Sequence, residues 1–192
     1  PVTTECPTEG SVSVSVTGSH FGVSSDMLTV SIGPYECQHI VIGPGLCSES
    51  SVKCRSEDDC FSSITDLCVT TSLTCLLPSG AGRDNIVRVV SSGCPGESEF
   101  VSYLSYAKPE VVSVSGCDPS EASDTSTVLC PTQGGARMTV TGHNFGASGS
   151  VVLMGGRLCD NREHGSSLEA HVQLTCDLPA GSGVDLGVIV IQ

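Results

Sequence analysis

The stretch VTGSHFG at residues 16–22 returns in nearly the same form as VTGHNFG at residues 140–146. Each copy follows a Cys-Pro-Thr triplet that starts at Cys6 or at Cys130, and the offset between the copies is 124 residues from the Cys to the last Gly. A match that extends over a spaced set of landmarks predicts an internal repeat.

Landmarks further along the chain follow in the same order. A strand-like run at 27–33 leads to Cys37 and a similar run at 151–156 leads to Cys159, while LTCLLPSG at 73–80 answers to LTCDLPAG at 174–181. Cys37 and Cys75 are 38 residues apart but Cys159 and Cys176 only 17, so the first copy carries about 21 extra residues. We therefore predict two tandem domains, 1–107 with a Cys-rich insertion at about 38–74, and 108–192.

The composition is typical of short strands and turns. Charged residues make up 15% of the chain, aromatic residues 4%, and Trp is absent, whereas Gly, Ser, Thr and Val are abundant. The formal net charge of -13 argues against nucleic acid as a partner and against anionic membrane surfaces, because both are bound through Lys and Arg.

Twelve cysteines in 192 residues indicate a disulfide-reinforced protein of the extracellular space or the cell surface. Zinc binding would require close pairs such as C-x2-C, which the chain lacks. There is also no run of 18 apolar residues, so we expect no membrane insertion in this segment, and any secretion signal or anchor to lie outside it.

Strict alternation of apolar and polar residues predicts the positions of the strands. SVSVSVT at 11–17 places Val12, Val14 and Val16 on one face and serines on the other, the period of a strand with one buried face. Similar alternation occurs at 28–32, 86–90, 100–106 and 111–114, with turn residues between the runs. This spacing predicts an all-β fold of antiparallel sandwiches.

Each residue of the repeated VTGxxFG motif can be given a structural role. We expect the strand to end at the Thr, the first Gly (Gly18 or Gly142) to adopt a positive φ, and the Phe (Phe21 or Phe145) to fold back onto the core. The second Gly, Gly22 or Gly146, then redirects the chain into the next strand.

The order T-G-x-x-F-G, strand, Cys, then C-x-x-P-x-G before another strand, resembles the IPT/TIG family of immunoglobulin-like domains. The resemblance covers almost the whole chain. The matching positions are Thr17, Gly18, Phe21, Gly22, Cys37, Cys75, Pro78 and Gly80, and in the second copy Thr141, Gly142, Phe145, Gly146, Cys159, Cys176, Pro179 and Gly181. It implies two disulfide-rich β-sandwiches of the kind found in plexin-like receptor ectodomains and large surface or adhesion proteins. Such a fold does not specify a ligand.

Three disulfides are expected. In the resembling domains the repeat-equivalent pairs Cys37 with Cys75 and Cys159 with Cys176 bridge neighbouring strands. Cys117 with Cys130 would close a loop rich in Asp and Ser. The pairing of the others stays open, since connectivity does not follow from spacing; these are Cys6, Cys47, Cys54, Cys60, Cys68 and Cys94.

Candidates for metal or catalytic chemistry are weak. Glu57, Asp58 and Asp59 could hold Ca²⁺, but without a D-x-D-x-D-G pattern the sequence favours a solvated acidic loop tied down by disulfides, and we predict no metal and no cofactor. No G-x-S-x-G, H-E-x-x-H or P-loop motif occurs, so we predict no enzyme. O-linked glycans on the Ser/Thr-rich loops are compatible with the sequence, while no N-x-[ST] acceptor is present.

Comparison of the two copies indicates that each lacks a strand that the other copy has. The first has a last strand at 100–106 but no counterpart of the strand at 111–114, whereas the second has that first strand and ends after 186–191. An apolar strand at an open edge accepts other strands. We predict an assembly edge formed by Leu186, Val188, Val190, Phe100, Leu104 and Val111; a chain that is simply one excerpt of a long ectodomain is the alternative.

The favoured function is that of a non-enzymatic structural or adhesive module of an extracellular filament, appendage or large surface protein. Its partners would be further copies of itself or adjoining domains, with strand donation between units. The alternative is a ligand- or carbohydrate-binding receptor ectodomain, for which Tyr35, Tyr103, Tyr106 and four Phe would have to supply the stacking platform.

Overall fold

A computed structural model describes residues 2–19, 21–22, 24–47, 53–54, 68–92, 96–97, 103–117, 123 and 125–192. Nearly all regular structure in these ranges is β-strand, and the helices there are two 3-10 turns, η1 (Ser25–Met27) and η3 (Ser167–His171). The predicted all-β, immunoglobulin-like class is confirmed.

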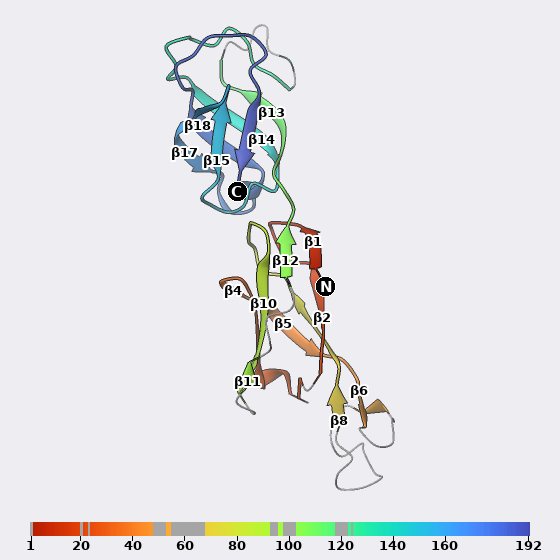
Figure 1. Cartoon of the computed structure of the whole chain (residues 1–192). Helices are drawn as coiled ribbons and strands as arrows, with labels where there is room; N and C mark the ends of the chain where they lie inside the picture. Colours follow the sequence, from red (N-terminus) through yellow and green to blue (C-terminus); the bar gives the residue numbers. More distant parts are fainter. Residues whose placement is uncertain are drawn as a thin grey trace. The chain divides into compact units, whose positions relative to one another are not determined.

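The first repeat contains two sheets that form the sandwich (Figure 1). One has the order β2-β9-β5, and the other β1-β12-β10-β3-β4, with β11 also paired to β10. Their bounds are β1 Val2–Cys6, β2 Ser13–Thr17, β3 Leu28–Ile32, β4 Tyr35–Glu36, β5 Gln38–Ile42, β9 Ser72–Leu76, β10 Asn85–Ser91, β11 Gly96–Glu97 and β12 Tyr103–Tyr106. The insertion adds a small sheet of β6 (Gly45–Cys47), β7 (Lys53–Cys54) and β8 (Cys68–Thr70), in the order β7-β6-β8.

The second repeat is the simpler copy. Its sheets have the orders β13-β14-β18-β17 and β16-β15-β19, and each described pairing is antiparallel. The bounds are β13 Glu110–Ser115, β14 Arg137–His143, β15 Val151–Met154, β16 Arg157–Leu158, β17 Asp160–His164, β18 Gln173–Asp177 and β19 Val188–Ile191.

Alternating side chains supply the core of the second repeat. Met138, Val140, Leu174 and Cys176 point inward from β14 and β18 and are buried, as their period of two requires. They pack with Phe145, Val152, Met154, Cys159 and Val190. In the first repeat Val30 and Ile32 are fully buried in the same way.

By contacts the chain divides into two compact units. Unit 1 comprises Pro1–Val2, Gly10–Pro78 and Asp84–Leu104, and unit 2 comprises Thr3–Glu9, Ser79–Arg83 and Ser105–Gln192. These units do not coincide with the two predicted domains. The domain boundary between residues 107 and 108 therefore remains a proposal that rests on the sequence repeat.

Several strand ends differ from the expected ones by one or two residues. The run at 11–17 forms a strand only from Ser13, because Ser11 has a φ of 60°. The last apolar run becomes a strand at Val188, so Leu186 precedes β19. Within the described part of the run at 100–106, the strand is Tyr103–Tyr106.

Candidate interaction surfaces

The repeated Gly-x-x-Phe-Gly turn fixes how each sandwich closes. Phe145 is fully buried and Phe21 nearly so, while Gly22 and Gly146 have φ values of 79° and 77°. Both Phe rings therefore contribute to the core, and the second Gly supplies the left-handed conformation.

The role assigned to the first Gly was wrong. Gly18 and Gly142 are not among the residues with positive φ. A Cβ at Gly18 would lie 2.7 Å from Cζ of Phe21, and one at Gly142 would lie 2.7 Å from Cζ of Phe145. The Phe ring folds back directly over each of these glycines, and at Gly142 the main-chain carbonyl of Glu110 in the neighbouring strand lies closer still. Neither steric requirement is displayed by the motif itself.

Four disulfides lie among the described residues: Cys37–Cys75, Cys54–Cys68, Cys117–Cys130 and Cys159–Cys176. Two of them join repeat-equivalent cysteines, and the buried Cys159 and Cys176 belong to the core cluster of the second repeat. Cys54–Cys68, left open by the sequence, joins β7 and β8 within the insertion.

The other cysteines contribute no described bond. Cys6 is a free thiol, buried at 7% exposure, and burial raises its pKa. Cys60 and Cys94 lie outside the described residues, as do the acidic residues Glu57, Asp58 and Asp59. No cluster of metal-ligating side chains occurs in the part of the chain that the structure describes.

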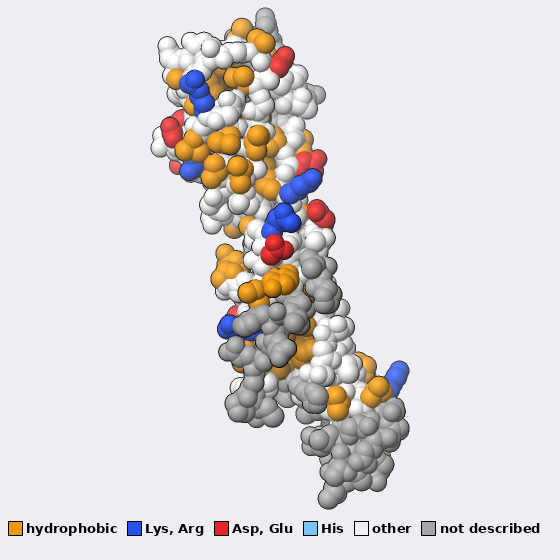
Figure 2. Space-filling view, viewed as in Figure 1, with side chains coloured by type: hydrophobic (Ala, Val, Ile, Leu, Met, Phe, Trp, Pro, Cys, Tyr) orange, Lys and Arg blue, Asp and Glu red, His pale blue; other side chains and the backbone are white. Residues whose placement is uncertain are grey.

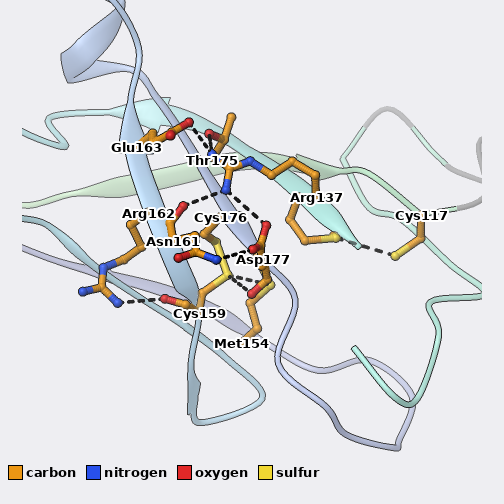
Figure 3. Close-up of a disulfide and its surroundings, with 11 residues drawn as sticks. Cys117, Arg137, Met154, Cys159, Asn161, Arg162, Glu163, Thr175, Cys176 and Asp177 are labelled. Carbon is orange, nitrogen blue, oxygen red and sulfur yellow. Dashed lines mark hydrogen bonds and ion pairs between the residues drawn. A yellow bond between two sulfur atoms is a disulfide. The ribbon is translucent and has the colours of Figure 1, made fainter. Parts of the chain in front are cut away.

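The outer face of the β13-β14-β18-β17 sheet is polar, and Arg137 organises it (Figure 3). Its guanidinium donates to the Asn161 carbonyl oxygen at 2.6 Å, to Oδ1 of Asp177 at 3.1 Å and to Oγ1 of Thr175 at 2.7 Å. It also forms an ion pair with Oε2 of Glu163 at 2.5 Å. The network clamps β14, β18 and β17 together over the Cys159–Cys176 disulfide.

We expect this network to make the stability of the second repeat depend on pH in the acid range. The hydrogen bond from Nδ2 of Asn161, at 2.6 Å, and then those from Arg137 lower the pKa of the Asp177 carboxyl. A lowered folded-state pKa stabilises the fold above the unfolded value of about 3.9, and this contribution is lost as the pH falls through the folded value. We expect D177N to show a shallower loss of melting temperature than the wild type between about pH 5 and pH 2.

Thermal melts at a series of pH values check this prediction. The matched control is D185N, which removes an exposed carboxylate outside the network and should keep the wild-type dependence. Parallel curves for D177N and the wild type would contradict the assignment.

The opposite sheet, β16-β15-β19, has an outer face that is apolar. Val152, Met154 and Val190 point into the core, so Val151, Leu153, Ile189 and Ile191 point outward. Ile189 pairs with Leu153 and Ile191 with Val151, and Leu158 of β16 also pairs with Leu153. We call these five side chains the apolar face; Figure 2 shows hydrophobic side chains gathered over this sheet.

The structure describes five of the six residues of the predicted assembly edge. Val188 and Val190 lie in β19, Leu186 precedes it and is 52% exposed, and Val111 lies in β13. Leu104 is buried in β12, and Phe100 lies outside the described residues. The edge therefore remains a proposal for β19 alone.

The match to a family of known domains agrees with this architecture. The IPT/TIG domain family matches residues 2–106 and 123–192. Among solved structures, the chain is similar to the plexin A4 full extracellular region, domains 1 to 10, at 17% identity and a TM-score of 0.35. That alignment covers 98% of this chain but only 13% of the plexin chain. No curated protein matches the sequence.

The chain belongs to the IPT/TIG domain family. Its disulfides place it in the extracellular space or at the cell surface, as the cysteine content predicted. Within the described ranges, no helix has the length and hydropathy to cross a membrane.

Proposed function

We propose that this chain is a non-enzymatic contact module of an extracellular assembly, and that it binds protein by accepting a strand at β19. The observation that supports this proposal most directly is a difference between the two repeats. In the first, β10 lies between β3 and β12; in the second, the equivalent β19 pairs among the described residues with β15 only.

The backbone of β19 is oriented for such a pairing. The Gly155 amide donates to the Gly187 carbonyl at 3.0 Å, so the peptide groups of 187, 189 and 191 face β15. Those of Val188 and Val190 consequently face away from β15. These outward N–H and C=O groups are the main-chain partners that an added strand uses.

The pairing of β10 with β12 in the first repeat supports a particular kind of strand as the ligand. Ile32 pairs with Val87 as Met154 pairs with Val188, which aligns Asn85 and Ile86 with Leu186 and Gly187. β12 pairs antiparallel with β10 at those two positions, opposite Leu104 and Tyr103. The expected ligand is therefore an extended segment with the chemistry of β12, whose sequence YLSY combines aromatic and aliphatic side chains with one serine.

Carbohydrate recognition has less support. A shallow depression of the second repeat is lined by Val112, Thr141, Gly142, His143, Glu169, Val172 and Gln173. This lining offers no Tyr or Phe ring for sugar stacking, whereas an open strand edge needs no such platform. We therefore favour protein over carbohydrate as the ligand.

Binding of a fluorescent peptide with the sequence of residues 100–107 to the full chain, measured by anisotropy, tests the proposal. We expect saturable binding that V188P weakens at least about tenfold, because Pro removes an outward N–H without removing a bond to β15. A scrambled peptide is the control. No binding up to about 1 mM peptide, or equal binding by V188P, would overturn strand addition at this edge.

A further inference from the structure

The apolar face is a departure from the ordinary pattern of an antiparallel sheet. Such a sheet usually packs one face on the core and solvates the other. The β13-β14-β18-β17 sheet obeys this rule with Thr139, Thr175 and Asp177 pointing outward. On the β16-β15-β19 sheet, the outward Ile189, Ile191 and Leu158 are 55%, 48% and 46% exposed.

The first repeat supplies an internal control for this face. The registers align Thr29 with Val151, Ser31 with Leu153, Arg88 with Ile189 and Val90 with Ile191. The same sheet in the same fold thus carries two hydroxyls and a guanidinium at three of these four positions in one copy, and aliphatic side chains at all four in the other. Folding does not require an apolar surface at these positions, so the surface indicates contact with something else.

We propose that the apolar face is the contact through which two copies of this chain pair, sheet face against sheet face. Each chain carries a net charge of -13, so two copies repel one another over most surfaces. β15, β16 and β19 contain no acidic residue, and their only charged side chain is Arg157. The apolar face is therefore a place where two copies can meet without opposing carboxylates.

A sheet of this kind can also pack against a second copy of itself. Two twisted antiparallel sheets pack face to face through interdigitating aliphatic side chains, at a small angle between their strands. A two-fold axis over the β15–β19 pair would set the apolar face of one copy against the same side chains of the other, as an isologous interface requires. The first repeat does not offer a matching surface, because Arg88 and Ser31 stand at its centre. This pairing is independent of strand addition at the β19 edge.

The first repeat also supplies the substitutions for a test of this proposal. The variant V151T/L153S/I189R gives the second repeat the residues that the first repeat carries at the same positions. Sedimentation velocity of the full chain over a range of concentrations should show a wild-type dimer and raise the dimer Kd of this variant at least about tenfold. The matched control V41T/L46S/I86R alters three other exposed apolar residues and should dimerise like the wild type.

A converse variant keeps the test decisive if the first one unfolds. T29V/S31L/R88I builds a second apolar face on the first repeat and should drive association beyond the dimer. A wild type that stays monomeric, or a dimer that survives V151T/L153S/I189R in folded form, would overturn the proposal. A dimer that survives this variant but is dissociated by the 100–107 peptide would overturn it while leaving strand addition intact.

Discussion

Replacement of Phe145 by alanine is expected to destabilise the second repeat by about 3–5 kcal/mol, the usual cost of removing a buried aromatic ring. Phe145 is fully buried, and its ring closes over Gly142 within the core cluster. Its main chain is fixed as well, because its amide donates to the His171 carbonyl at 2.8 Å and its own carbonyl accepts from the Ser150 hydroxyl. Because the main chain of the turn is held in this way, it cannot move inward to fill the cavity that loss of the ring would leave.

Chemical denaturation of F145A and of the control V184A measures this loss. Val184 is 85% exposed, so V184A should change stability by less than about 0.5 kcal/mol. F21A, the repeat-equivalent change, should destabilise the first repeat by a comparable amount. A loss below about 1 kcal/mol for F145A would show that the turn does not anchor the sandwich.

Removal of the Cys159–Cys176 disulfide by C159A/C176A is expected to cost at least about 3 kcal/mol. The bond closes a loop of 17 residues, for which the chain-entropy relation gives about this value. Both cysteines are fully buried in the core cluster, so their truncation also removes packing.

The matched variant C117A/C130A separates the two contributions. That disulfide closes a loop of similar length, with a sequence separation of 13, but its cysteines are only half-buried. The entropic part should be similar, so C159A/C176A should be the less stable variant in denaturant titrations. Equal stability of the two variants would mean that burial of the disulfide adds nothing.

The fold was predictable because the repeat encodes it twice. Val12, Val14 and Val16 alternate with serines, and the landmarks around Cys37 and Cys159 recur in order, so the strands and the repeat followed from the pattern. The family followed from the resemblance of the repeated motif to known domains. The motif glycines were predicted as turn residues, but the reason for Gly18 and Gly142 depends on where a Phe ring lies in space. A sequence pattern contains no such distance.

The surfaces were harder to predict. The Arg137 network joins residues 24 to 40 positions apart on three strands, which no local pattern reveals. The apolar face was missed because VVLM at 151–154 is a continuous apolar run, whose two faces cannot be told apart without the register. Comparison of the outward residues of the two repeats would have been the usable signal.

Hydrogen exchange of individual amides tests the central claim, that β19 presents an open edge to a protein partner. Without peptide, the amides of Val188 and Val190 should exchange rapidly, while that of Ile189, bonded to β15, should be protected. Saturation with the 100–107 peptide should slow the exchange of Val188 and Val190 at least about tenfold and leave Ile189 unchanged. Protection of Val188 and Val190 in the free monomer, or no change on adding the peptide, would contradict the account.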